Sequence, residues 1–164
     1  MTRKIALAIA AALLPLPATA AGEPRTIAGV AEPYKTVAFD PAADPTAAID
    51  AALAAAKISR KRVLLVMGTN NCHDSAWLAN LIASDRFAPV RARYEIIYAD
   101  IGMPHVASRG KHPEVPQRFG FRIKGTPTVA VLDADGNVLN RRAAPKWRNA
   151  ASRSDDAIYN ELMR

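Results

Sequence analysis

Apolar runs at intervals along the chain predict the strands of a buried sheet. Residues 63–67 (Val-Leu-Leu-Val-Met) show no alternation of apolar and polar positions, which is typical of a strand buried on both faces. Residues 94–99 and 128–132 are also apolar and of strand length. A weaker pattern at 35–39 indicates an earlier strand. Residues 138–140 follow a turn rich in Asp, Gly and Asn, so they predict the return strand of a hairpin.

Helix signals lie between these runs. Asp44 followed by Pro45 is the pattern of an N-cap and a first helical residue, and the basic residues 60–62 suit the negative C-terminal end of that helix. A second helix is predicted to begin at Cys72, a short third one near 113–119, and a last one with a cap at 152–154. Helical connections predict parallel strands, and the final hairpin is antiparallel. The expected fold is an α/β domain with a mixed central sheet and helices on both faces.

The first twenty residues have the three parts of a secretory signal peptide. Basic Arg3 and Lys4 precede an apolar run, 5–14, and small residues lead to a cleavage site after Ala20. The run is shorter than the roughly 20 residues that span a membrane. We therefore expect export and cleavage, a periplasmic location, and no stable membrane insertion after cleavage.

The remaining chain divides into a lead-in with weak pattern, residues 21–43, and one domain, residues 44–164. The formal net charge is +7, but the basic residues are scattered, with short clusters at 60–62 and 141–142. Helix ends and solvated loops account for such clusters, and an exported protein rarely meets nucleic acid. The sequence predicts no nucleic-acid partner and implies no acidic partner.

Cys72 is the only cysteine of the chain. A single cysteine excludes an intramolecular disulfide. A lone thiol in an oxidising compartment indicates either a reactive group or a disulfide bond to another molecule, which could be a second copy of this chain linked through Cys72. At a helix start, unpaired N–H groups and the positive end of the dipole stabilise the thiolate, which is the species that attacks disulfides.

The order of a buried strand, a short loop, Cys72 at a helix start and the run Gly-Thr-Pro-Thr at 125–128 resembles the thioredoxin superfamily. The resemblance extends from Asp44 to Asn140 and is greatest to exported thioredoxin-like proteins with a C-x-x-S site. It implies a three-layer thioredoxin-like sandwich in which Cys72 is the exposed nucleophile. It also implies that Pro127, preceded by Thr126, has a cis peptide bond and lies against the sulfur.

The chain departs from the family pattern at several positions around this cysteine. Ser75 replaces the second cysteine, so a mixed disulfide on Cys72 would persist until a thiol arrived from outside, although the Ser75 hydroxyl could hydrogen-bond the Cys72 sulfur. Val66 replaces the buried acid that serves the second thiol. Asn70 and Asn71 stand where aromatic residues are usual.

The charged neighbours of the cysteine and two other patterns have weaker implications. His73, if protonated, would favour the thiolate, whereas Asp74 would oppose it. Asp133, Asp135 and Asn137 imitate the start of a calcium loop, but the glycine is misplaced and the expected glutamate is absent, so we predict a hairpin turn. Trp77 and Trp147 are interpreted as packing residues, with Trp147 as an alternative lining of a partner groove.

The sequence leaves three functions open. The first is a monothiol redox protein that forms mixed disulfides with envelope proteins or carries a low-molecular-weight thiol on Cys72. The second is a non-catalytic binding or scaffold module with the thioredoxin fold. The third is a metal-handling protein that uses Cys72 with His73, His105 and His112, although these residues lack ligand spacing and no cofactor or metal is predicted.

Overall fold

A three-stranded sheet forms the centre of the molecule. The computed structural model describes residues 25–164, and the predicted signal peptide, residues 1–20, lies outside the described residues. Strand β1 (Arg62–Gly68) lies between β2 (Tyr94–Asp100) and β3 (Thr128–Leu132). Every residue of β1 after Arg62 is buried, as the unbroken apolar run predicts.

The directions of the strands only partly match the prediction. Strands β1 and β2 are parallel, with Gly68 opposite Asp100, but β3 is antiparallel to β1, with Met67 opposite Thr128. The expectation of a parallel third strand was wrong. The connection from β2 to β3 stays at the end of the sheet where β2 finishes, so β3 starts there and runs back.

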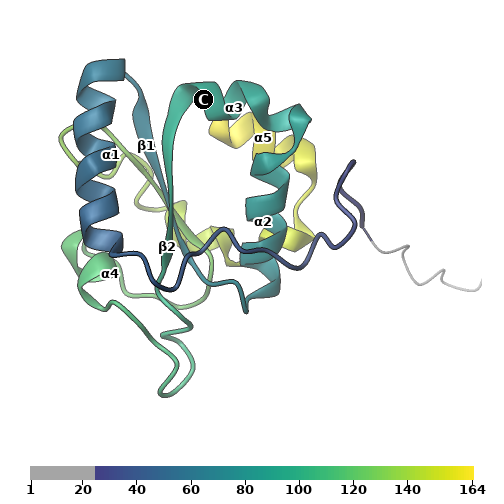
Figure 1. Ribbon diagram of the computed structural model, residues 1–164, viewed down its shortest axis with the longest axis horizontal. Coiled ribbons are helices and arrows are strands. Elements are labelled where there is room, and N and C mark those ends of the chain that lie inside the picture. Colours follow the sequence, from purple (N-terminus) through teal and green to yellow (C-terminus); the bar gives the residue numbers. More distant parts are fainter. Residues whose placement is uncertain (1–24) are drawn as a thin grey trace, which may run out of the picture.

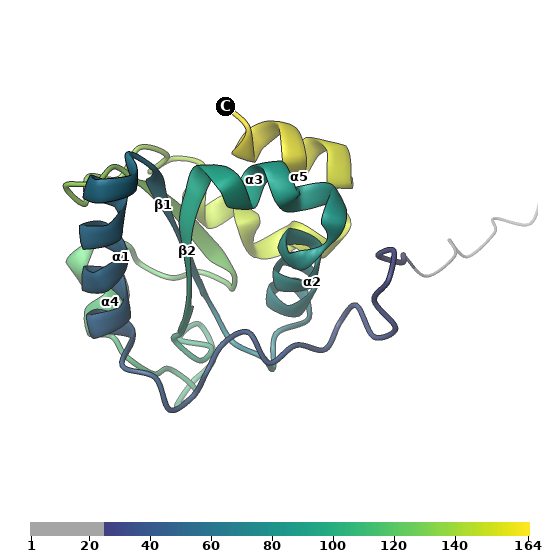
Figure 2. The ribbon, with the colours of Figure 1, turned by 45° about the horizontal axis from the view of Figure 1, so that its top comes forward.

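Helices cover both faces of this sheet, as Figures 1 and 2 show from two directions. One face carries α1 (Pro45–Ser59) and α4 (Glu114–Arg118). The other face carries α2 (His73–Ala83), η1 (Asp85–Phe87), α3 (Ala88–Arg93), η2 (Ala144–Ser152) and α5 (Asp155–Leu162). The three-layer α/β architecture predicted from the sequence is confirmed.

Strand β1 supplies side chains to both hydrophobic cores. Leu64 and Val66 pack on the side of α2, whereas Val63, Leu65 and Met67 pack on the side of α1. Because successive side chains of a strand point to opposite faces, a strand that is apolar at every position needs a helical layer on each side. The pattern of this one strand thus explains the layers.

Helix α1 begins as its sequence predicts. The Asp44 carboxylate accepts hydrogen bonds from Thr46 N at 2.9 Å and Ala47 N at 3.2 Å, and Pro45 occupies the first helical position. The helix ends at Ser59, and Arg60 follows in the left-handed region with φ of 59°. The last helix has the predicted cap as well, since Ser154 Oγ accepts from Ala157 N.

The lead-in packs on the domain without forming a strand. Residues 25–43 run across the lower end of the sheet in Figure 1 and bring Ile27 and Phe39 into the core beside α2. The predicted strand at 35–39 is wrong: Val37 is exposed, and the backbone of Phe39 pairs with the side chain of Asn70 instead of a strand.

The predicted hairpin after β3 is shortened to its turn. Asp133 accepts bonds from the backbone of Asn137, and the return strand is reduced to a bridge between Leu132 and Val138. The side chain of Asn140 then pairs with β3: it accepts from Val131 N and donates to Val129 O, both at 2.9 Å. One amide side chain therefore occupies the edge that a fourth strand would cover. Within residues 25–164, no helix combines the length and the apolar character needed to cross a membrane.

Candidate functional site

Cys72 lies where β1 turns into α2. It is the N-cap residue of α2, with φ of −105° and ψ of 118°, and it is half-buried. Its N–H donates to Thr69 O at 3.2 Å across the turn, and its carbonyl accepts from Ala76 N at 2.9 Å in the first turn of the helix. No side chain caps the helix, so the thiol is the side chain that stands at the positive end of its dipole.

The loop before β3 meets this thiol. The peptide bond between Thr126 and Pro127 is cis, the isomer that the family resemblance implies, and both residues are buried. The Cys72 Sγ donates a hydrogen bond to the carbonyl oxygen of Thr126 at 3.1 Å. Two segments 54 residues apart in the sequence are thus joined at the sulfur atom.

The hydrogen bond to Thr126 has a chemical consequence. A thiol can donate to a carbonyl oxygen, but a thiolate has no proton to donate and faces the same partial negative charge. The Thr126 carbonyl oxygen is therefore a hydrogen-bond partner for the Cys72 S–H, and the start of α2 lies beside the same sulfur.

Ser75 lies three residues further along α2 and is completely buried. Its hydroxyl has no hydrogen-bond partner among the described residues, so the bond to Cys72 that the sequence suggested is not made. The Ser75 Oγ lies against Gly68: it would be 2.6 Å from a Cβ placed on that glycine. Gly68 is thus required by the close approach of α2 to the end of β1.

The two residues between Cys72 and Ser75 contact other segments of the chain. The ring of His73 stacks on Tyr34 of the lead-in, with centroids 4.0 Å apart and an angle of 9°. Asp74 accepts a hydrogen bond from Ala151 N at 2.8 Å and so ties α2 to η2. The structure gives His73 no hydrogen bond to Cys72 within the described part of the chain.

Comparisons with known proteins agree with this geometry. A family model described as a thioredoxin-like domain matches residues 49–144. The chain belongs to the thioredoxin-like family. Among solved structures, a disulphide isomerase from Xylella fastidiosa Temecula1 is similar, with a TM-score of 0.67 and 28% sequence identity over 76% of this chain and 93% of that one. Comparison with curated protein sequences gives no match.

In this thioredoxin-like chain the turn before Cys72 is held by Asn70, which the sequence marked only as a departure from the family pattern. The Asn70 side chain accepts from Phe39 N at 3.0 Å and donates to Phe39 O at 2.8 Å. The turn before Cys72 is thereby bound to the lead-in. A lone asparagine gives no sequence signal for such a pairing, because its partner lies 31 residues away.

The position of the missing family acid is filled by apolar packing. Val66 is buried between its strand neighbours Tyr98 and Val129. The ring of Tyr98 lies edge-on to Phe39, and burial raises the pKa of Tyr98 despite an opposing effect of Arg91. Neither neighbour can accept a proton in place of a carboxylate at neutral pH.

Asp100, at the end of β2, is an acid that sequence reasoning missed. Burial raises the pKa of Asp100, but hydrogen bonds from Lys111, Gly102 and Thr69 outweigh that effect and hold its pKa below the ordinary value of 3.8. The bond from Lys111 Nζ measures 2.8 Å, and that from Gly102 N 3.0 Å. Since the Thr69 carbonyl also accepts from Cys72 N, the carboxylate supports the turn that carries the thiol.

The metal hypothesis gains no support from the described residues. His112 pairs with Glu114 at 3.1 Å, and His105 lies in the exposed part of the same loop. Residues 25–164 contain no group of three or more His, Cys, Asp or Glu side chains that could hold a metal ion. The Asp133 carboxylate is used by its own turn, as predicted.

Both tryptophans are packing residues, as the sequence indicated. Trp77 and Trp147 are buried in the core on the side of α2. The guanidinium groups of Arg25 and Arg153 lie over their rings, at 4.2 Å and 4.4 Å from the centroids. Trp147 therefore does not line an open groove.

We expect Asn70→Ala to lower the free energy of unfolding by about 1–3 kcal/mol, because it removes both hydrogen bonds to the Phe39 backbone. Urea denaturation would measure the loss. Asn71→Ala is the matched control, since Asn71 is exposed, and it should change the free energy by less than about 0.5 kcal/mol. Equal losses in the two variants would contradict the role of Asn70.

We expect stability to fall as the pH drops below 3.8, because protonation of Asp100 then ends its bonds with Lys111, Gly102 and Thr69. A pKa lowered by folding adds stability above its unfolded value, and that stability is lost as the pH falls through the folded value. In Lys111→Met this pH dependence should weaken. Urea unfolding between about pH 2 and pH 5 would measure how the free energy of unfolding depends on pH. The control is Lys146→Met, at an exposed lysine, which should retain the wild-type dependence on pH.

Proposed function

We propose that this thioredoxin-like protein is a periplasmic monothiol redox protein whose Cys72 forms mixed disulfides with envelope proteins or carries a low-molecular-weight thiol. The observation that carries the proposal is the position of the Cys72 sulfur, half-buried at the start of α2 and against the Thr126–Pro127 bond. The proposed location rests on the signal-peptide pattern of residues 1–20.

The proposed chemistry is thiol–disulfide exchange that stops at the mixed disulfide. The Cys72 thiolate attacks one sulfur of a partner disulfide, a bond forms between Cys72 and that sulfur, and the other partner sulfur leaves as a thiolate. No net oxidation occurs. Because Ser75 carries a hydroxyl, the chain has no second thiol to release the partner, so release needs a thiol from outside.

The hydrogen bond from Cys72 to Thr126 favours a second candidate, a non-catalytic binding module. The Cys72 S–H already has a hydrogen-bond partner within the fold, and a partner could bind beside Pro127 without reacting. The two candidates differ in whether a partner becomes covalently attached.

Reaction of the folded mature protein with a peptide disulfide tests the proposal. We expect intact-mass spectrometry to show one peptide attached per chain, stable until a thiol is added, and no attachment in Cys72→Ala. The matched measurement is the same reaction in denaturant. If the unfolded chain reacts but the folded chain does not, the monothiol proposal fails and the binding module is favoured.

Ser75→Cys should supply the missing second thiol. In that variant we expect mild oxidation to close a bond between positions 72 and 75, and the peptide adduct to be released without an external thiol, because the two residues lie one turn apart at the start of α2. Free-thiol counting and turnover of a disulfide substrate would measure both effects. The control is Ser59→Cys, which places a second thiol at the end of α1. It should neither form an intramolecular disulfide with Cys72 nor release the peptide adduct. Two free thiols in oxidised Ser75→Cys would contradict the placement of Cys72 and Ser75.

A further inference from the structure

A basic pocket lies at the end of the sheet opposite Cys72. Strand β1 begins there, α1 ends there, and the marked C-terminus lies beside it at the top of Figure 1. The pocket has a volume of about 440 Å³. Its lining includes five cationic residues: Arg60, Lys61, Arg62, Arg93 and Arg164.

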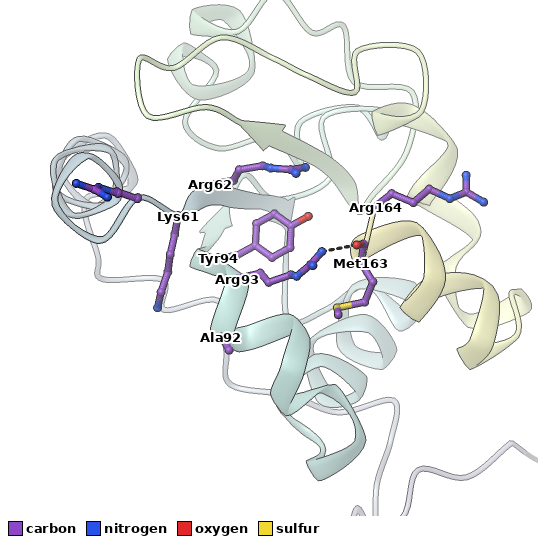
Figure 3. Close-up of a pocket in the computed structure, with 8 residues that line it drawn as sticks. Lys61, Arg62, Ala92, Arg93, Tyr94, Met163 and Arg164 are labelled. Carbon is purple, nitrogen blue, oxygen red and sulfur yellow. Dashed lines mark hydrogen bonds between the residues drawn. The ribbon is translucent and has the colours of Figure 1, made fainter.

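Tyr94 stands between two of the arginines in this pocket. Figure 3 shows the side chains of Arg62 and Arg93 on either side of the Tyr94 ring. Arg62 and Tyr94 are register partners on β1 and β2, and the Tyr94 hydroxyl donates to Leu162 O at 2.8 Å. Burial raises the pKa of Tyr94, whereas Arg62 and Arg93 lower it, so both charges lie close to the ring. The arginines thus flank a fixed aromatic side chain.

Three helix C-termini near the pocket offset part of its positive charge. Helices α1, α3 and α5 all finish here, and each C-terminus carries roughly half a negative charge. Arg93 donates to Met163 O at the end of α5, and Lys61 lies 3.7 Å from the Glu95 carboxylate. Arg93 and Lys61, two of the five cationic residues, thus already have partners within the fold.

The other three cations have no carboxylate partner. Within residues 25–164, the ion pairs of the structure include none from Arg60, Arg62 or Arg164. Elsewhere, Arg86, Arg118 and Arg153 each pair with an Asp or Glu, whereas Arg122 and Arg142 are also absent from the ion pairs of the described residues, so it is the number of cations at one place that distinguishes the pocket. The pocket therefore keeps an excess of positive charge at one place.

The backbone of Arg60 adds an independent observation. Its φ of 59° lies in the left-handed region, where glycine is favoured at the end of a helix and an arginine is strained. The fold thus places an arginine side chain at the pocket where glycine would satisfy the backbone better. Strained backbone positions cluster at functional sites, so this arginine is a candidate for a role in the pocket.

We propose that this pocket binds a phosphate-class anion, held by the guanidinium group of Arg62 beside Tyr94 and by the other cationic residues that line the pocket, Arg60 among them. Arginine donates several hydrogen bonds in a planar fork that matches the oxygens of a phosphate. The ligand chemistry is the same for a free phosphate compound and for the headgroup of an anionic lipid. The site is independent of the thiol chemistry, because Cys72 lies at the other end of β1.

Calorimetry with inorganic pyrophosphate at low salt tests this site. We expect binding to one site in the mature protein, and at least a tenfold loss of affinity in the double variant Arg60→Gly with Arg62→Gln. The matched control is Arg122→Gln with Arg142→Gln, which removes the same charge at exposed arginines outside the pocket and should retain wild-type affinity within about twofold. Thermal unfolding should show the first double variant to be folded, since glycine relieves the strain at position 60.

Vesicles distinguish the two sources of the anion. Binding to phosphatidylglycerol vesicles that pyrophosphate displaces and the pocket variant loses would assign a lipid headgroup, whereas pyrophosphate binding without vesicle binding would assign a free phosphate compound. Equal losses in the two double variants would show an effect of net charge alone and overturn the proposal. Failure of the wild-type protein to bind either probe would also overturn it.

Discussion

The burial of β1 on both faces is the constraint on which the rest of the structure depends. Its side chains alternate between two cores, so a helical layer is needed on each side, and its two edges are taken by β2 and β3. The same strand carries the chain from the basic pocket at Arg62 to the turn before Cys72. A fault in its packing would therefore disturb both ends of the molecule at once.

The site around Cys72 has a thioredoxin-like framework that carries a single sulfur atom. The thiol at the start of α2 and the cis bond before Pro127, which the family resemblance implies, are both present. A buried hydroxyl at Ser75 replaces the family's second thiol, and an apolar side chain at Val66 replaces the acid that serves that thiol. The chemistry that we propose at Cys72 therefore stops at a mixed disulfide, because the sequence has no second cysteine to complete the exchange.

Two polar residues that take no part in that chemistry hold the turn in place. Asn70 binds the lead-in to the turn through two hydrogen bonds, and Asp100 reaches it through Thr69. The lead-in is thus part of the framework of the site, since it also stacks Tyr34 on His73. The family similarity over residues 49–144 does not include it.

The sequence by itself determined the three strands of the sheet, the helix caps and the place of the only cysteine. The apolar run of β1, the Asp44 and Ser154 caps and the position of Cys72 are local patterns, and the structure has all of them. Only the tertiary structure decided the direction of β3, the pairing of Phe39 with Asn70, the isolation of the Ser75 hydroxyl and the meeting of Arg93 with the basic residues 60–62. Each of these depends on contacts between segments far apart in the chain, and neither spacing nor composition specifies such contacts.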